Sequence, residues 1–163
     1  MPDQIEELAT LATKETLIGD MIVSLIATMR DGISFYDNAE RLSRDAYLGQ
    51  LYRKMIERRE AAVERLLPFA TPSRAEVSES ERIHMVAERI WTNIKATILE
   101  SDEVFLFALV DLESRTLAEI ETTYDGAPDE DVRWVLRELQ TEFSSSFADM
   151  RQAQSRWRAD IME

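Results

Sequence analysis

Three glutamates stand within or beside runs of apolar residues that recur at helical spacing, where a carboxylate could do chemistry. Glu113 and Glu60 each interrupt such a run, and Glu40 follows Tyr36 by four residues. Carboxylates that point into a helical bundle can hold iron or manganese when enough of them converge. Three glutamates alone are short of the ligands that an octahedral or di-metal site requires. Glu40, Glu60 and Glu113 are therefore candidate metal ligands, but they are too few for a complete site.

His84 is the one histidine of the chain, and it forms a Glu-x-x-His pair with Glu81. This spacing places both side chains on one helical face, and di-iron bundles use two such pairs. One pair at the start of a helix cannot supply both sets of ligands. The sequence therefore predicts a solvated helix start at this point, and no resident metal or other cofactor.

A buried ion pair is the competing interpretation of Glu113. A second stripe of apolar residues runs over residues 46–67, and its middle is filled by Glu57, Arg58, Arg59 and Glu60. At least one of these four must point inward if the stripe is continuous. A buried charge is tolerated when it is paired and hydrogen-bonded. We predict that Arg58 or Arg59 faces Glu113 across the bundle.

The sequence lacks the residue patterns that other catalytic mechanisms need. The chain has no cysteine, which removes disulfides, thiolate metal sites and thiol nucleophiles. No serine stands in a nucleophile-elbow context, and no glycine-rich phosphate loop is present. These patterns favour a protein that is not an enzyme.

Two local features favour contacts between helices or between chains. The run Ser144–Ser146 would let a neighbouring helix approach closely. Arg151, Arg156 and Arg158 surround Trp157 and form a basic aromatic end, for which an oligomer contact is favoured over nucleic-acid binding. Two further aromatic residues are predicted in the core or at a helix interface: Trp91 and Trp134.

The composition is that of a globular protein with an acidic surface. Of 163 residues, 45% are hydrophobic and 31% are charged, and the net charge of −13 repels phosphate backbones and anionic membranes. The start, MPDQIEELAT, is acidic where a secretory leader would be basic. We predict one domain over residues 1–163, a cytoplasmic location, and no nucleic-acid or membrane partner.

Apolar residues recur every three or four positions through most of the chain, which predicts an all-α protein. In the first helix this stripe contains Ile18, Ile22, Leu25, Met29 and Tyr36, with Leu8 and Leu11 prolonging it backwards. Gly32 on the stripe indicates close approach of a neighbour, and Asp45 is a predicted N-cap. Five helices are predicted: about 3–43, 46–67, one from Ser78 or Ser80 to about 98, 103–124 and 128–161.

The helix order suggests how the bundle is connected. The first two helices and the last two have short connections and are expected to pair antiparallel, which leaves the third as a crossover. That arrangement is a ferritin-like four-helix bundle with an additional crossover helix. A plain up-down bundle, in which the third helix joins the core, is the alternative.

A set of motifs is spread over roughly residues 16–155: Asp31-Gly32, Phe35-Tyr36, Ala39-Glu40, an Arg59-centred second helix, Glu88-Arg89-Ile90-Trp91 and Tyr124. Together they resemble a bacterial ferritin-like family of unknown function, whose members are small stress-associated or uncharacterised cytoplasmic proteins. The chain departs from the family pattern at Ile33, Glu88 and Leu117, and each departure removes a possible ligand or polar partner.

These observations favour a non-enzymatic structural or interaction protein without a complete di-metal site. We expect it to form a homodimer through an apolar helix face. The alternative is a ferritin-like iron or manganese carboxylate protein that uses Glu40, Glu60 and Glu113. A binder of small molecules, with its pocket between helices, is the third possibility.

Overall fold

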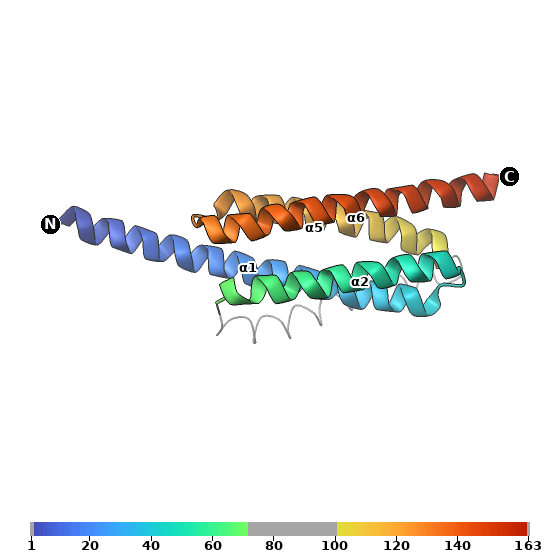
Figure 1. The fold of residues 1–163 in the computed structure, drawn as a ribbon, viewed down its shortest axis with the longest axis horizontal. Coiled ribbons are helices and arrows are strands. Elements are labelled where there is room, and N and C mark those ends of the chain that lie inside the picture. The colour runs from blue at the N-terminus through green and yellow to red at the C-terminus, as the bar shows by residue number, and fades with distance from the viewer. Residues whose placement is uncertain (1, 72–100, 163) are drawn as a thin grey trace.

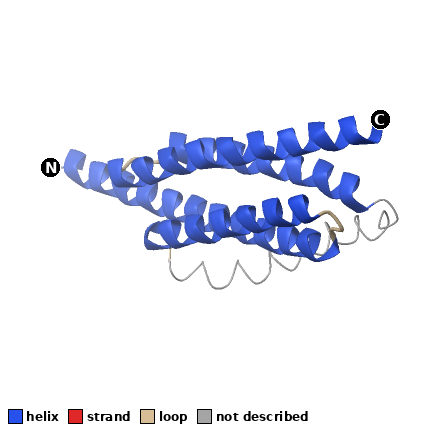
Figure 2. Cartoon of the chain, turned by 45° about the vertical axis from the view of Figure 1, so that its right-hand side comes forward, coloured by secondary structure: helices blue, strands red, loops and turns tan. Residues whose placement is uncertain are grey.

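The computed structural model describes residues 2–71 and 101–162, and this part of the chain is helical apart from short connections, with no strand (Figure 2). The prediction of an all-α protein is confirmed for these residues. The elements are α1 (Pro2–Leu42), α2 (Ala46–Leu66), the 3₁₀ helix η1 (Leu67–Phe69), α5 (Ser101–Gly126) and α6 (Glu130–Met162). The predicted third helix lies outside the described residues.

The helix ends follow local capping chemistry. Asp45 precedes α2 in an extended conformation, and its carboxylate accepts a hydrogen bond from the Leu48 backbone N–H at 3.1 Å, so the predicted N-cap is confirmed. The last helix begins at Glu130 and not at the predicted Pro128. Asp129 accounts for the shift of two residues, because its carboxylate accepts from the Asp131 N–H at 3.2 Å and so caps a helix that begins at Glu130.

The helices form two antiparallel hairpins that lie side by side (Figure 1). The first hairpin is α1 with α2 and the second is α5 with α6; α1 also packs against α5, and α2 against α6. Because α2 and α5 run in the same direction, residues 71 and 101 lie at opposite ends of the molecule (Figure 1). This order of helices is compatible with both predictions for the third helix, a crossover and a member of an up-down bundle.

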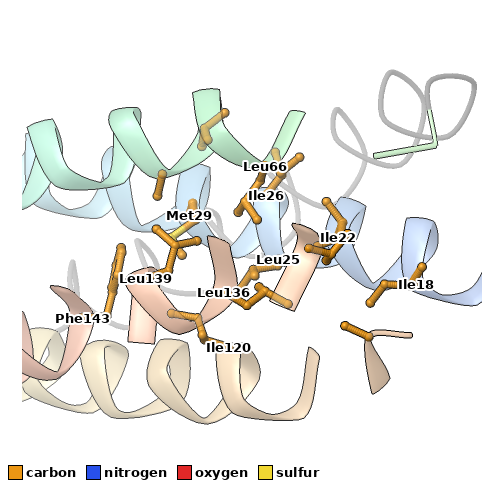
Figure 3. Packing of buried hydrophobic residues seen from close by; sticks show 14 residues of the cluster. Ile18, Ile22, Leu25, Ile26, Met29, Leu66, Ile120, Leu136, Leu139 and Phe143 are labelled. Atoms are coloured by element: carbon orange, nitrogen blue, oxygen red, sulfur yellow. The ribbon is translucent and has the colours of Figure 1, made fainter. Parts of the chain in front are cut away.

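Buried apolar residues form two clusters, one toward each end of the bundle. Figure 3 shows the first cluster, in which Ile22 and Leu25 of α1 meet Leu136 and Leu139 of α6. The second cluster gathers residues such as Phe35, Tyr52 and Leu106 near the α1–α2 connection. The predicted α1 stripe is buried throughout: Ile18, Ile22, Leu25, Met29 and Tyr36.

A layer of polar residues separates the two apolar clusters. In α2 the second cluster ends at Ile56 and the first begins at Ala62, with Arg59 buried between them. In α5 Glu113 and Thr116 occupy the corresponding gap, and both are fully buried. The fold therefore brings polar side chains from separate helices to the middle of its core.

Some apolar residues predicted to be covered are exposed. Leu8 and Leu11 expose 66% and 48% of their surface, because the start of α1 projects past the neighbouring helices (Figure 1). Trp134, predicted in the core or at a helix interface, is 59% exposed on α6. Trp91 lies outside the described residues. Within residues 2–71 and 101–162, no helix combines the length and apolarity needed to cross a bilayer.

Candidate functional site

Arg59 and Glu113 meet in the polar layer at the centre of the molecule. Arg59 Nη2 donates to Glu113 Oε1 at 2.9 Å, and neither side chain reaches solvent. Arg59 comes from α2 and Glu113 from α5, so this contact links the two hairpins. The geometry is a charge-assisted hydrogen bond between fully desolvated partners, which is stronger than a neutral one.

The same carboxylate oxygen also accepts from a tyrosine. Tyr36 OH donates to Glu113 Oε1 at 2.6 Å, and Arg59 Nη2 donates further to Thr116 Oγ1 at 3.0 Å. Arg59 Nη1 reaches the Thr28 carbonyl at a longer 3.4 Å. Three helices (α1, α2 and α5) thus contribute to one network of buried hydrogen bonds, which we call the Arg59 network.

The guanidinium of Arg59 lies among aromatic rings. Its Cζ is 5.6 Å from the ring centre of Tyr36 and 5.5 Å from that of Phe143 on α6. Cation–π attraction at this range replaces part of the hydration that the buried charge has lost. Among the described residues Arg59 Nε and Glu113 Oε2 have no hydrogen-bond partner, so these residues compensate the desolvation of the pair only in part.

Gly32 makes room for this guanidinium on α1. A Cβ at position 32 would lie 2.2 Å from Arg59 Nη1 and 2.4 Å from its Cζ. The predicted close approach at Gly32 is therefore found, and the neighbour that approaches is a side chain of α2. Glycine costs roughly 1 kcal/mol relative to alanine inside a helix, and the space for Arg59 offsets that cost.

Tyr36 is held in its neutral form. Burial raises the pKa of the Tyr36 hydroxyl well above its usual value, and the nearby Glu113 carboxylate raises it further, against the opposing effect of Arg59. A neutral phenol is the species that can donate its proton to Glu113. The raised pKa and the 2.6 Å hydrogen bond therefore agree, because both correspond to a protonated Tyr36 hydroxyl.

The structure does not bring the three metal candidates together. Glu60 is exposed on α2, and Glu40 is half-buried on α1, where its Oε2 lies 3.9 Å from Arg53 Nη1. Across residues 2–71 and 101–162, no three acidic or histidine side chains are grouped so that they could hold a metal ion. His84 lies outside the described residues. Of the three glutamates, Glu113 alone is in the core, where it contacts Arg59.

Arg58 faces a different neighbour from Arg59. Its Nη1 donates to Ser146 Oγ at 2.7 Å and lies 3.5 Å from the Asp149 carboxylate, both on α6. Ser146 is buried, whereas Ser144 and Ser145 are exposed, so one serine of the predicted packing patch lies at a helix contact. Arg58 therefore contributes to the α2–α6 contact and not to the Glu113 pair.

Further polar contacts hold the helices in register. Glu119 of α5 accepts hydrogen bonds from Thr28 at 2.6 Å and from Ser24 at 3.1 Å, both on α1. Between α2 and α6, Arg65 pairs with Glu138 and, at 3.2 Å, with Glu142. Sequence reasoning missed these contacts, although the spacing of Ser24 and Thr28, like that of Glu138 and Glu142, puts each pair on one helical face.

A shallow surface hollow of about 330 Å³ lies between α2 and α6. Lys54 and Asp149 pair across it at 3.4 Å, so its charges already satisfy each other. Nothing in its lining specifies a ligand for the small-molecule hypothesis. The lining residues are Tyr47, Gln50, Leu51, Lys54, Asp149 and Gln152.

Comparison with known families decides the classification. Residues 18–126, about two thirds of the chain, match the model of a domain of unknown function, DUF2383. The chain belongs to the DUF2383 family. The predicted resemblance to a family of unknown function is confirmed to this extent. No curated protein and no solved structure matches the chain.

The DUF2383 match contains the buried pair. It runs from Ile18 in α1 to Gly126 at the end of α5, so it includes Gly32, Arg59 and Glu113. It starts after the projecting beginning of α1, and it ends before α6. The Arg59 network thus belongs to the family domain, while α6 adds Phe143 from outside the matched residues.

Proposed function

We propose that this DUF2383 protein is a ferritin-like helical bundle with a structural or interaction role, and that it is not an enzyme. The observation that carries the proposal is the Arg59 network. In a carboxylate metalloprotein of this architecture the centre of the bundle holds the metal. Here the centre holds a guanidinium hydrogen-bonded to Glu113.

The charges of the network oppose a divalent cation. Glu113 Oε1 already accepts from Arg59 and from Tyr36, and the positive guanidinium stands where a metal would have to approach. Glu40 and Glu60, the other two candidate ligands, lie outside the core. A cation at Glu113 would displace Arg59 into a space that the neighbouring side chains already fill, and this supports a structural role for the interior.

An interior closed in this way leaves the outer surface for function. Large apolar side chains are exposed at several places, among them Leu8 at 66% and Trp134 at 59%. Exposed apolar groups support interaction with a protein partner when they gather in patches. We propose that the partner is a second copy of the chain, giving a homodimer or a larger homo-oligomer, and that the protein acts in the cytoplasm, in keeping with its lack of cysteine.

Elemental analysis tests the proposal. The full chain is expressed in medium supplemented with iron and manganese and purified without chelator, beside Glu113→Ala and the surface control Glu60→Ala. We expect no stoichiometric metal in any of the three proteins. Near-stoichiometric iron or manganese in the wild type and in Glu60→Ala, lost in Glu113→Ala, would overturn the proposal in favour of the carboxylate metalloprotein.

A further inference from the structure

We infer that copies of this chain associate end to end, with the start of α1 in one copy packed against the α1–α2 end of the next. The inference rests on the interaction role proposed above and names the two surfaces. The first surface is residues 3–11 of α1, which we call the arm. The second is the receiving end, formed by exposed Leu42, Tyr47 and Phe107 beside Arg156 and Arg158.

The arm carries the core-facing stripe of α1 beyond the bundle. All residues from 3 to 11 are exposed, and Figure 1 shows the start of α1 projecting past the other helices. Leu8 and Leu11 precede Ile18 and Ile22 at helical spacing, so they lie on the face that is buried farther along α1. Ile5 is also 71% exposed. The arm therefore offers apolar side chains that nothing covers within the described part of the molecule.

The charge of the arm is acidic. Residues 3–11 contain Asp3, Glu6 and Glu7 and no basic residue. The nearby α5–α6 connection is flanked by further acids, including Asp125 and Asp129. Two arms facing each other would bring like charges together, which disfavours a dimer of arm against arm. The arm fits a partner surface that combines apolar and basic groups.

The receiving end has this combination. Tyr47 and Phe107 are 48% and 49% exposed, and each is flanked by a guanidinium: Arg156 lies 4.9 Å from the ring centre of Tyr47 and Arg158 lies 4.8 Å from that of Phe107. A stacked guanidinium keeps its planar edge of N–H donors, which suits bidentate contact with a carboxylate. Leu42, 43% exposed, adds apolar surface at the same end.

The two surfaces belong to opposite ends of the molecule (Figure 1). The helix α1 spans 41 residues, or roughly 60 Å at about 1.5 Å per residue, so an arm cannot reach the receiving end of its own chain. The contact therefore joins two copies of the chain through two different surfaces, the arm of one and the receiving end of the other. Each dimer keeps one free arm and one free receiving end, so association continues into longer assemblies as the concentration rises.

Sedimentation velocity of the full chain, at rising protein concentration and in low and high salt, tests the inference. We expect the sedimentation coefficient to rise with concentration in low salt. Salt should reverse the rise, because the Debye length falls from about 30 Å at 0.01 M to about 3 Å at 1 M. A species that stays monomeric in all these conditions would overturn the inference.

Charge-reversed variants identify the surfaces. Glu6→Lys/Glu7→Lys and Arg156→Glu/Arg158→Glu each place like charges across the contact, so each alone should weaken self-association by about tenfold or more. An equimolar mixture of the two variants should restore association, because a basic arm then meets an acidic receiving end while the unchanged ends pair as before. Failure of the mixture to restore association would overturn the pairing.

A control keeps the effect of net charge apart from that of the surfaces. Glu60→Lys/Glu64→Lys changes two exposed residues of α2 outside both surfaces and alters the net charge as much as the arm variant does. We expect it to associate as the wild type does. Association that the arm variant alters and the Arg156→Glu/Arg158→Glu variant leaves intact would show arm-to-arm pairing and refute the inference. Metal content, measured separately, tests the proposed function independently of association.

Discussion

Replacing Glu113 by leucine tests whether the Arg59 network is closed to water. The change introduces an apolar side chain of similar size and removes the charge that balances Arg59. It also removes the acceptor of two hydrogen bonds, at 2.9 Å from Arg59 and 2.6 Å from Tyr36. Hydrogen bonds to a charged group contribute about 1.5–3 kcal/mol each. The expected loss in free energy of unfolding is about 3–5 kcal/mol, the usual cost of removing one partner of a buried ion pair.

The double variant Arg59→Met/Glu113→Leu separates the pair from its surroundings. With both charges gone, the core is apolar at this layer, and such exchanges are often neutral or stabilising. The hydroxyl of Tyr36 is then left without its acceptor, at a cost of about 1–3 kcal/mol that the added change Tyr36→Phe should remove. The triple variant is therefore expected to be at least as stable as the wild type.

Urea unfolding followed by circular dichroism measures these free energies. Glu113→Gln is the matched control, since it keeps an acceptor oxygen for Arg59 and Tyr36 while losing the charge, and its loss should be smaller than that of Glu113→Leu. The reasoning is refuted if Glu113→Leu loses less than about 1 kcal/mol, because an unpaired guanidinium would then be reaching water. A double variant that loses as much stability as Glu113→Leu would also refute it, because removal of the unpaired guanidinium would then recover nothing.

Two further predictions concern the glycines and the tyrosines. Gly32→Ala should destabilise the protein by about 1–3 kcal/mol in urea unfolding, because the new Cβ would overlap the Arg59 guanidinium. Gly49→Ala should instead stabilise it by about 0.5–1 kcal/mol, because within the described residues no atom beyond the adjoining part of α2 lies within 4 Å of the new Cβ. Burial raises the pKa of Tyr36 and of Tyr52, so their contribution to stability is complete below the pKa of about 10 of an unfolded tyrosine and is lost as the pH rises above it. The free energy of unfolding measured above pH 10 should fall by up to about 1.4 kcal/mol per pH unit for each of the two, and Tyr52→Phe should reduce that slope; a slope unchanged in Tyr52→Phe would contradict the shift.

The periodicity of α2 distinguishes Arg59 from Arg58. An inward side chain was required among four charged residues, and Arg59 is the one that the structure buries. Its position could have been chosen over Arg58, because Arg59 follows Ile56 by three residues and precedes Val63 by four, which keeps it on the buried face. Arg58 is rotated by one residue and reaches α6 at Ser146.

Glu60 shows where a sequence stripe misleads. It is spaced like a core residue relative to Ile56 and Val63, yet it is exposed, as is Leu67 seven residues later on the same line. Spacing defines a face of the helix but not how far a neighbouring helix covers that face. Leu8 and Leu11 illustrate the same limit along the helix axis: their stripe continues, but α1 has 41 residues and its partner α2 has 21, so the start of α1 extends past its partner.

Gly32 and Arg59 illustrate why the interior could be anticipated only in part. A glycine on a buried helical stripe indicates that something approaches closely, but sequence spacing does not identify a contact between residues 27 positions apart in the chain. In the structure the guanidinium occupies the space beside Gly32, is hydrogen-bonded to Glu113 and lies near the Tyr36 ring. Any change that turned this interior into a metal site would first have to remove Arg59, because its charge and its volume both stand in the way of a cation. The glycine and the arginine are thus two parts of one packing solution, in which the missing Cβ of α1 admits the positive charge that holds Glu113.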